Sequence, residues 1–137
     1  PICEFENPVE KLIETLKAEA IGMVELVPIR NKPQVLRHYV TAILNAGIAV
    51  VAGTEHNTLD VIPMEPACVG GAPVPEDLKD IFVEGAYVVA AHQYLTLNGK
   101  CGFVDSAGRP NPVYKDAQSR IAAFAKIGRA VVAKYLG

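Results

Sequence analysis

Two short apolar segments, each preceded by an amphipathic helical pattern, constrain the fold of this chain more than any other feature of its sequence. The apolar segments lie at residues 23–29 and 48–53, and the helical patterns at 8–20 and 32–46. In both patterns the apolar side chains recur on one helical face. A further apolar segment at 1–5 gives the order strand, helix, strand, helix, strand. Connections of only a few residues between such elements favour parallel strands joined by right-handed crossovers.

Boundary residues agree with these two helices. Asn7 is expected to cap the first helix, with Pro8 at its first helical position. Asn31 is expected to cap the second helix, and Gly47 follows that helix in the position that a left-handed C-cap favours. These signals predict helix ends close to the ends of the apolar periodicity.

Helical patterns dominate the second half of the chain. Residues 57–75 contain several prolines and an adjacent pair of glycines, which predicts a long ordered loop. Helices are expected at 76–97 and 115–135, with a strand at 86–91 as the alternative within the first of them. The sequence therefore predicts a single α/β domain over 1–137, built from parallel β-α-β units with additional C-terminal helices. Three strands make a thin sheet, so the pattern is more typical of part of a larger β/α assembly.

Composition excludes several classes of protein. The 137 residues carry a formal net charge of −2 with scattered basic residues, which gives no electrostatic basis for binding nucleic acid. The apolar runs are much shorter than a membrane span, so no membrane association is expected. Cys3, Cys68 and Cys101 are odd in number and widely spaced, which indicates neither a disulfide framework nor a zinc knuckle. These features predict a protein of a reducing, cytoplasmic setting.

A sheet with so few strands leaves edges and helix faces uncovered. We therefore expect a homo-oligomer, or an N-terminal segment that precedes Pro1 in a longer protein. Removal of a methionine, cleavage of a propeptide and a fragment of a longer protein would each leave a chain that begins with this proline.

Polar residues follow both central strands directly. The sequence GTEHN occupies residues 53–57, and RNK follows the preceding strand. Because the carboxyl ends of parallel strands meet at one edge of a sheet, we expect these groups to lie together and to contact a small-molecule substrate. Glu25 is added to them because an ionised carboxylate on a buried strand is costly unless it is paired or metal-bound. The candidate substrate-binding residues are Glu25, Arg30, Asn31, Lys32 and Asn57.

Glu55 and His56 are the candidate metal ligands. Carboxylate and imidazole groups suit zinc, manganese or iron. Neighbouring residues on an extended chain point in opposite directions, so both bind one ion only if the backbone turns between them. Two protein ligands hold an ion weakly, and the site is expected to be incomplete in this chain. The alternative is a polar loop in which Thr54 or Asn57 caps a turn and His56 is solvated, while His92 is interpreted as a satisfied histidine of a helix.

The segment AGIAVVAGTEHNT resembles the late strand of the PHP (polymerase and histidinol phosphatase) family. In that family a helix-ending glycine, an apolar strand and a G-S-D-x-H segment supply metal ligands. Gly53, Thr54 and Glu55 match the first three positions of that segment by type. His56 then comes one residue early, and Asn57 stands at the position of the family's histidine.

The resemblance implies a distorted β/α barrel, a cluster of divalent metals and hydrolysis of phosphoesters. It also implies an early H-x-H motif, which this sequence lacks. Since its three histidines are isolated, the chain would be the C-terminal portion of such a barrel and catalytically silent by itself. Most of the metal ligands would then belong to the missing portion.

The sequence leaves three hypotheses for function open. In the first, the chain is the C-terminal portion of a PHP-like hydrolase in which metal-activated water attacks a phosphoester, and Arg30 or Lys32 meets the phosphate. In the second, it is a non-enzymatic α/β module that binds a small molecule or a partner through residues 53–57 and the proline-rich loop. In the third, Pro1 is a catalytic amine, because tautomerases resemble this chain in starting with Pro-Ile; their paired arginines are not evident here.

Overall fold

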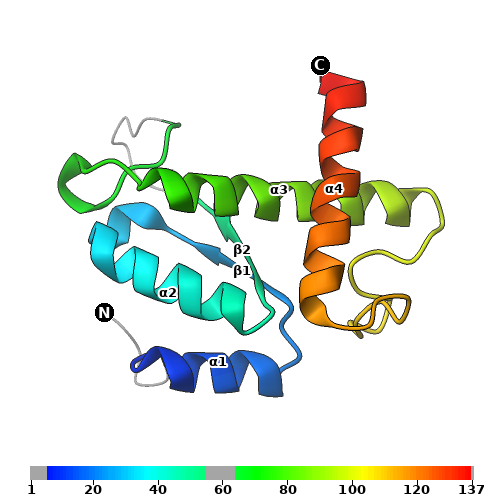
Figure 1. Ribbon diagram of the computed structural model, residues 1–137, viewed down its shortest axis with the longest axis horizontal. Helices are drawn as coiled ribbons and strands as arrows, with labels where there is room; N and C mark the ends of the chain where they lie inside the picture. The colour runs from blue at the N-terminus through cyan, green and yellow to red at the C-terminus, as the bar shows by residue number, and fades with distance from the viewer. Residues whose placement is uncertain (1–5, 55–63, 137) are drawn as a thin grey trace.

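The computed structural model describes residues 6–54 and 64–136. Within these residues, the chain forms four α-helices and a short parallel sheet, which confirms the α/β class (Figure 1). The elements in chain order are α1 (Val9–Ala18), β1 (Met23–Leu26), η1 (Pro28–Arg30), α2 (Pro33–Asn45), β2 (Ala49–Ala52), η2 (Val69–Gly71), α3 (Glu76–Leu97) and α4 (Ala117–Leu136). No helix in the described part of the chain is long and apolar enough to cross a membrane.

The strands β1 and β2 pair in parallel, as predicted from the helix between them. Met23 pairs with Ala49 and Leu26 with Ala52, so α2 forms the crossover between neighbouring strands. Both strands are shorter than predicted. The expected extension of the first strand to residue 29 is wrong, because Pro28 has no amide hydrogen to donate to a sheet and begins η1.

The predicted N-caps of the first two helices, Asn7 and Asn31, are also wrong. The N-cap residues are Pro8 and Lys32, and neither forms a side-chain capping hydrogen bond. The side-chain amide of Asn31 instead donates to the carbonyl oxygen of Val27 at 3.0 Å. Asn31 therefore stabilises the turn before α2 rather than the helix itself.

Helix α3 forms along its whole predicted length, which excludes the alternative of a strand at 86–91. It meets β2 at Gly85, where a Cβ atom would overlap the carbonyl oxygen of Val50. Since Ala49 and Gly53 donate amide hydrogens toward β1, the intervening Val50 carbonyl points to the opposite edge of the strand. Helix α3 therefore covers the outer edge of β2.

Two clusters of buried side chains pack on the two faces of the sheet. Val24 and Val50 face the first cluster, whereas Met23 and Ala49 face the second, because side chains alternate along each strand. The first cluster contains Leu16, Leu36, Val40, Ile43, Ile48, Val50, Cys68, Val74, Leu78 and Phe82. The second contains Ala49, Val88, Ala91, Phe103, Ile121, Phe124 and Ala125. The second cluster thus joins the start of the sheet to the crossing of α3 and α4 (Figure 1).

Other close approaches and turns depend on glycine. A Cβ atom at Gly128 of α4 would overlap the backbone of Tyr87 in α3, so this glycine allows the two helices to cross closely. Gly47 has a φ angle of 83°, which confirms the left-handed position predicted after α2. The expected strand at 1–5 lies outside the described residues. The described sheet, with its two strands, is too small to define a barrel, and the barrel stays a prediction.

Candidate functional site

The carboxyl ends of β1 and β2 form the edge at which the sequence predicts a site; we call it the strand-end edge. There the Glu25 carboxylate lies against Gly53, and a Cβ atom at Gly53 would overlap it. The Gly53 amide donates to the carbonyl oxygen of Leu26 at 2.9 Å, so strand pairing extends to the first residue of GTEHN. Glu25 is exposed. The predicted burial of the Glu25 carboxylate, and with it the need for a partner, is therefore wrong.

A pocket of about 260 Å³ lies beside the strand-end edge. Arg30 and Asn31 line it together with Leu26 of β1 and Tyr39 of α2. Glu25 is not part of this lining, because neighbouring residues on a strand point to opposite faces and Leu26 faces the pocket. The structure thus brings two of the predicted substrate-binding residues into one pocket and leaves the predicted carboxylate outside it.

The predicted polar residues of this edge differ in their exposure to solvent. The Asn31 side-chain amide donates to Val27, and the backbone carbonyl oxygen of Asn31 accepts a hydrogen bond from the Val69 amide at 3.0 Å. Lys32 is exposed at the start of α2, and Arg30 is exposed at the end of η1. The two cations are therefore better placed than the amide to contact an anionic group from solvent.

The remaining predicted residues, Glu55, His56 and Asn57, lie outside the described residues. In the parts of the chain that are described, no group of three or more His, Cys, Asp and Glu side chains could hold a metal ion. Thr54 is the last described residue before them, and it is exposed. Of the described strand-end residues, Glu25 is the one that offers a carboxylate to an ion.

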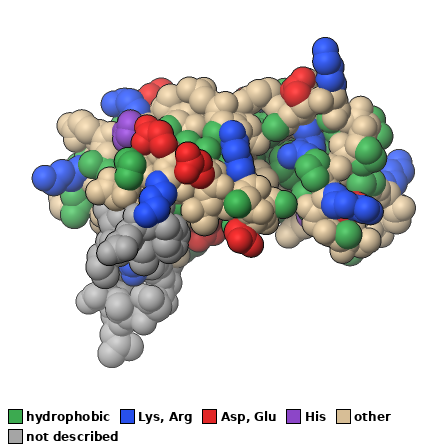
Figure 2. Space-filling view, turned by 90° about the horizontal axis from the view of Figure 1, so that it is seen from below, with side chains coloured by type: hydrophobic (Ala, Val, Ile, Leu, Met, Phe, Trp, Pro, Cys, Tyr) green, Lys and Arg blue, Asp and Glu red, His purple; other side chains and the backbone are tan. Residues whose placement is uncertain are grey.

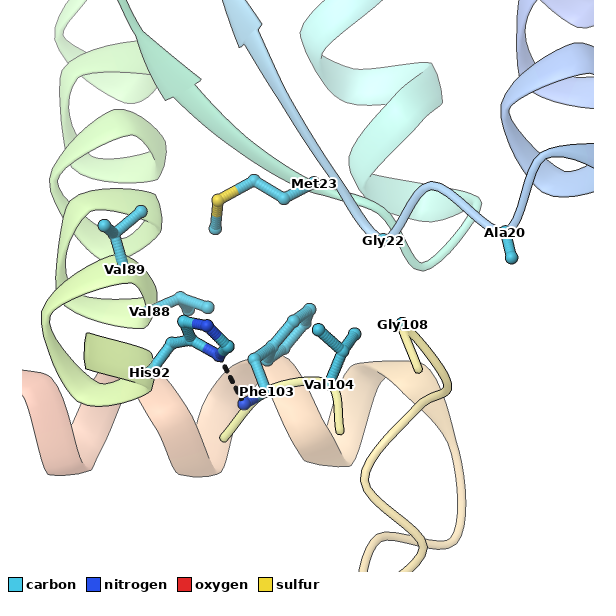
Figure 3. A pocket seen from close by; sticks show the side chains of 9 residues that line it. All are labelled: Ala20, Gly22, Met23, Val88, Val89, His92, Phe103, Val104 and Gly108. Carbon is cyan, nitrogen blue, oxygen red and sulfur yellow. Dashed lines mark hydrogen bonds between the residues drawn. The ribbon is translucent and has the colours of Figure 1, made fainter. Parts of the chain in front are cut away.

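A second pocket, the amino-end pocket, lies at the opposite end of the sheet beside the start of β1 (Figure 3). Its volume is about 370 Å³, close to the lower end of the range of roughly 300–1,000 Å³ that is typical of small-molecule sites. The side chains that line it come from the start of β1, from α3 and from the loop between α3 and α4. They include Met23, Val88, Val89, His92, Phe103 and Val104.

His92 supplies a polar side chain to this mostly apolar pocket. Its Nδ1 accepts a hydrogen bond from the Phe103 amide at 3.0 Å, which confirms that it is a satisfied histidine of a helix (Figure 3). In a neutral imidazole whose Nδ1 accepts, Nε2 carries the hydrogen and can donate. Gly102 lies against the Nδ1 edge of the ring, where a Cβ atom would overlap it. Nε2 is therefore on the ring edge that faces away from this loop.

Arg120 of α4 lies behind the pocket wall. Its guanidinium carbon is 4.4 Å from the centre of the Phe103 ring, and the residue is only 6% exposed. Its Nη2 is 3.7 Å from the place that a Cβ atom of Gly22 would occupy. Its Nε is buried and has no hydrogen-bond partner among the described residues. Burial lowers the pKa of Arg120, yet an arginine keeps its charge at neutral pH.

Sequence reasoning missed Arg120, although the sequence holds a signal for it. The residue directly precedes Ile121 and stands four positions before Phe124, on the apolar stripe of the helix expected at 115–135. A charged residue on the apolar stripe of an amphipathic helix is a departure from the pattern and marks a buried charge. The pocket itself had no signal, because it joins three segments that are far apart in the sequence.

No family model, curated protein or solved structure matches the chain. The distribution of surface charge does not indicate a function either. Acidic and basic side chains are interspersed on the face that Figure 2 shows, rather than gathered by sign. The chemistry of the strand-end edge and of the amino-end pocket is therefore what bears on function.

Proposed function

We propose that this chain contributes the strand-end edge to the active site of a PHP-like metal-dependent phosphoester hydrolase, as the C-terminal portion of its barrel. The observation that supports the proposal is the exposed Glu25 carboxylate, which lies against Gly53. Gly53 comes two residues before Glu55 in the sequence. Carboxyl ends of parallel strands are where β/α enzymes carry their catalytic residues. The likeness of GTEHN to the metal-binding segment of the PHP family is the reason for the choice of phosphoesters as substrates.

The donor groups suit a divalent ion. Carboxylates suit manganese, and a set of carboxylates with an imidazole also suits zinc or iron. In this proposal Glu55 and His56 hold the ion, Glu25 offers a further oxygen, and the other ligands belong to another segment or a second chain. When bound, the ion supplies Lewis-acid polarisation of the phosphoester and activation of water.

The two cations near the edge have a separate task in this proposal. Arg30 lines the neighbouring pocket, and Lys32 is exposed at the start of α2. A guanidinium can bind a phosphate through two parallel hydrogen bonds, whereas an ammonium acts as a point charge. Arg30 therefore orients the substrate phosphate, and Lys32 adds attraction at longer range.

Calorimetric titration of the chain with Mn²⁺ tests the metal site. We expect weak binding that is lost in Glu55→Gln and weakened about tenfold in Glu25→Gln. Glu14→Gln removes an exposed carboxylate of α1 and is the matched control, with unchanged binding. Failure of the unaltered chain to bind Mn²⁺, or equal binding by Glu25→Gln, would refute the proposal.

Hydrolysis of p-nitrophenyl phosphate in the presence of Mn²⁺ tests whether the site is incomplete. We expect no turnover by this chain alone, because it lacks the H-x-H motif of the family. Turnover that disappears in Glu55→Gln would mean that the metal site is complete within this chain, contrary to the proposal that another segment supplies ligands.

A further inference from the structure

The amino-end pocket supports an inference that does not depend on the proposed hydrolase. We propose that this pocket binds a small organic acid with an apolar body, such as an arylacetate, whose carboxylate reaches Arg120 past Gly22. The pocket lies at the opposite end of β1 from the strand-end edge, so the two proposals can fail separately.

The lining determines the body of the ligand. Met23, Val88 and Phe103 present apolar surface from three different segments of the chain (Figure 3). Removal of such surface from water on binding is favourable in proportion to the area buried. A volume of about 370 Å³ admits a body of about the size of one aromatic ring and its substituents.

Two groups near the pocket, His92 and Arg120, favour a negatively charged ligand. His92 Nδ1 is occupied by the Phe103 amide, which leaves the Nε2 hydrogen for a ligand acceptor. Arg120 is buried, its Nε has no partner among the described residues, and none of their ion pairs includes it. An acceptor that carries negative charge suits a guanidinium without a counter-ion, and a carboxylate matches its geometry.

The Phe103 ring alone is a poor substitute for an anion. A cation over an aromatic face gains less free energy than the effective cost of taking an ion out of water. Phe103 therefore offsets only part of the desolvation of Arg120. A bound carboxylate would add the charge-assisted hydrogen bonds that the guanidinium lacks.

Gly22 lines the pocket and lies beside the guanidinium of Arg120. A Cβ atom at this position would lie 3.4 Å from Phe103 Cε1 and 3.7 Å from Arg120 Nη2. Both distances are ordinary contacts, so an alanine fits there without displacing either side chain. In this proposal the added methyl group hinders the approach of a carboxylate to Arg120 Nη2.

Amide chemical shifts of the full chain, followed during titration with phenylacetate, test the proposal. Phenylacetamide has the same shape without the charge, and acetate has the charge without the ring. We expect phenylacetate to shift the amides of Met23, Val88, His92 and Phe103. It should bind about tenfold more tightly than phenylacetamide, and acetate should cause no shift up to about 10 mM.

Two variants and a control connect the binding to Arg120. Arg120→Met removes the charge at similar length, and phenylacetate should then bind no more tightly than phenylacetamide. Arg129→Met is the matched control, because Arg129 lies on the same helix and also stacks on a ring, that of Tyr87, but is exposed. If Arg120→Met does not fold, Gly22→Ala replaces it and should weaken phenylacetate binding about tenfold.

Three results would overturn the proposal. The first is the absence of shifts in the pocket amides with phenylacetate at about 10 mM. The second is equal affinity for the acid and the amide. The third is unchanged affinity for phenylacetate in both Arg120→Met and Gly22→Ala. None of them bears on the Mn²⁺ titration, which reports on the other end of the sheet.

Discussion

The charged side chains at the two ends of the short sheet differ in their exposure to solvent. At the strand-end edge, Glu25 and Arg30 are exposed, so water can solvate both side chains. At the amino-end pocket, Arg120 is 6% exposed and its Nε has no partner among the described residues. An exposed charge is stable without a ligand and therefore restricts the choice of ligand little. A buried charge without a counter-ion is costly, and it restricts that choice strongly.

The two ends also differ in how the chain builds them. The strand-end edge consists of residues that directly follow two strands, so its parts are near in sequence. The amino-end pocket depends on the second buried cluster, in which the Phe124 ring packs edge-to-face on the ring of Phe103. Mutations in that cluster should therefore affect the amino-end pocket far more than the strand-end edge.

Removal of the Phe124 ring gives the largest expected contrast between the two ends. This side chain is fully buried, and its ring centre is 5.3 Å from that of Phe103 and 5.6 Å from that of Tyr114. Phe124→Ala should lower the free energy of unfolding by about 3–5 kcal/mol. Urea denaturation followed by circular dichroism measures this change.

The control for that measurement is Tyr135→Ala, because Tyr135 lies on the same helix but is 61% exposed. It should change the free energy of unfolding by about 0.5 kcal/mol or less. A loss of less than about 1 kcal/mol in Phe124→Ala would contradict the view that the aromatic cluster supports the amino-end pocket.

Replacement of Arg120 by methionine should have a smaller effect, and in the opposite direction. Arg120→Met removes a buried cation without a counter-ion and keeps the apolar length of the side chain. We expect the free energy of unfolding to be unchanged or to rise by about 1 kcal/mol, because the lost desolvation cost exceeds the lost attraction to Phe103. A decrease of more than about 2 kcal/mol would instead assign Arg120 a structural role.

The control for this variant is Glu25→Gln at the strand-end edge. Glu25 is exposed, so the free energy of unfolding should change by about 0.5 kcal/mol or less. A higher free energy of unfolding in Arg120→Met, together with an unchanged value in Glu25→Gln, would show that the charge is costly only at the amino-end pocket. The same urea experiment provides both values.

Acid should loosen the loop that forms part of the amino-end pocket, and this is the smallest effect. The amides of Arg109 and Ala107 each donate to Asp105 Oδ1 at 2.9 Å, and these bonds lower the pKa of Asp105. Since the folded pKa is depressed, the stabilisation is present above the unfolded value of about 3.9 and is lost as pH falls through the folded pKa.

Amide hydrogen exchange of Val104 and Gly108 below about pH 4 would measure this loosening. In Asp105→Asn the loop should lose its dependence on pH in that range, since the titrating group is absent. Equal acid sensitivity in Asp105→Asn and the unaltered chain would assign the effect to another group.

Local patterns predicted the parts of the fold that depend on local geometry. The periodicity of α3 and the short crossover between β1 and β2 are of this kind. The length of β1 was overestimated, because the apolar run continues past Leu26 while Pro28 prevents further pairing. As a helix cap, the Asn31 side-chain oxygen was expected to accept a hydrogen bond from a backbone amide, yet its side-chain amide donates to the Val27 carbonyl. Sequence spacing does not decide between these two local hydrogen bonds.

The candidate sites show the same limit. Arg30 and Asn31 were predicted to lie near a ligand, and both line a pocket. Glu25 was expected to be buried, but the second cluster covers its face of the sheet only near Met23 and Ala49. How far a cluster extends over a sheet depends on packing between distant segments. No local pattern in the sequence carries that information.

The position of α3 along β2 also determines where a further strand can join the sheet. The Val50 carbonyl faces Gly85, so another strand could not pair at that edge without displacing the helix. In the described part of the chain, the opposite edge of β1 has no strand beside it. A strand from elsewhere in a longer protein, or from a second copy, would therefore add next to β1. The sheet can grow from one side only.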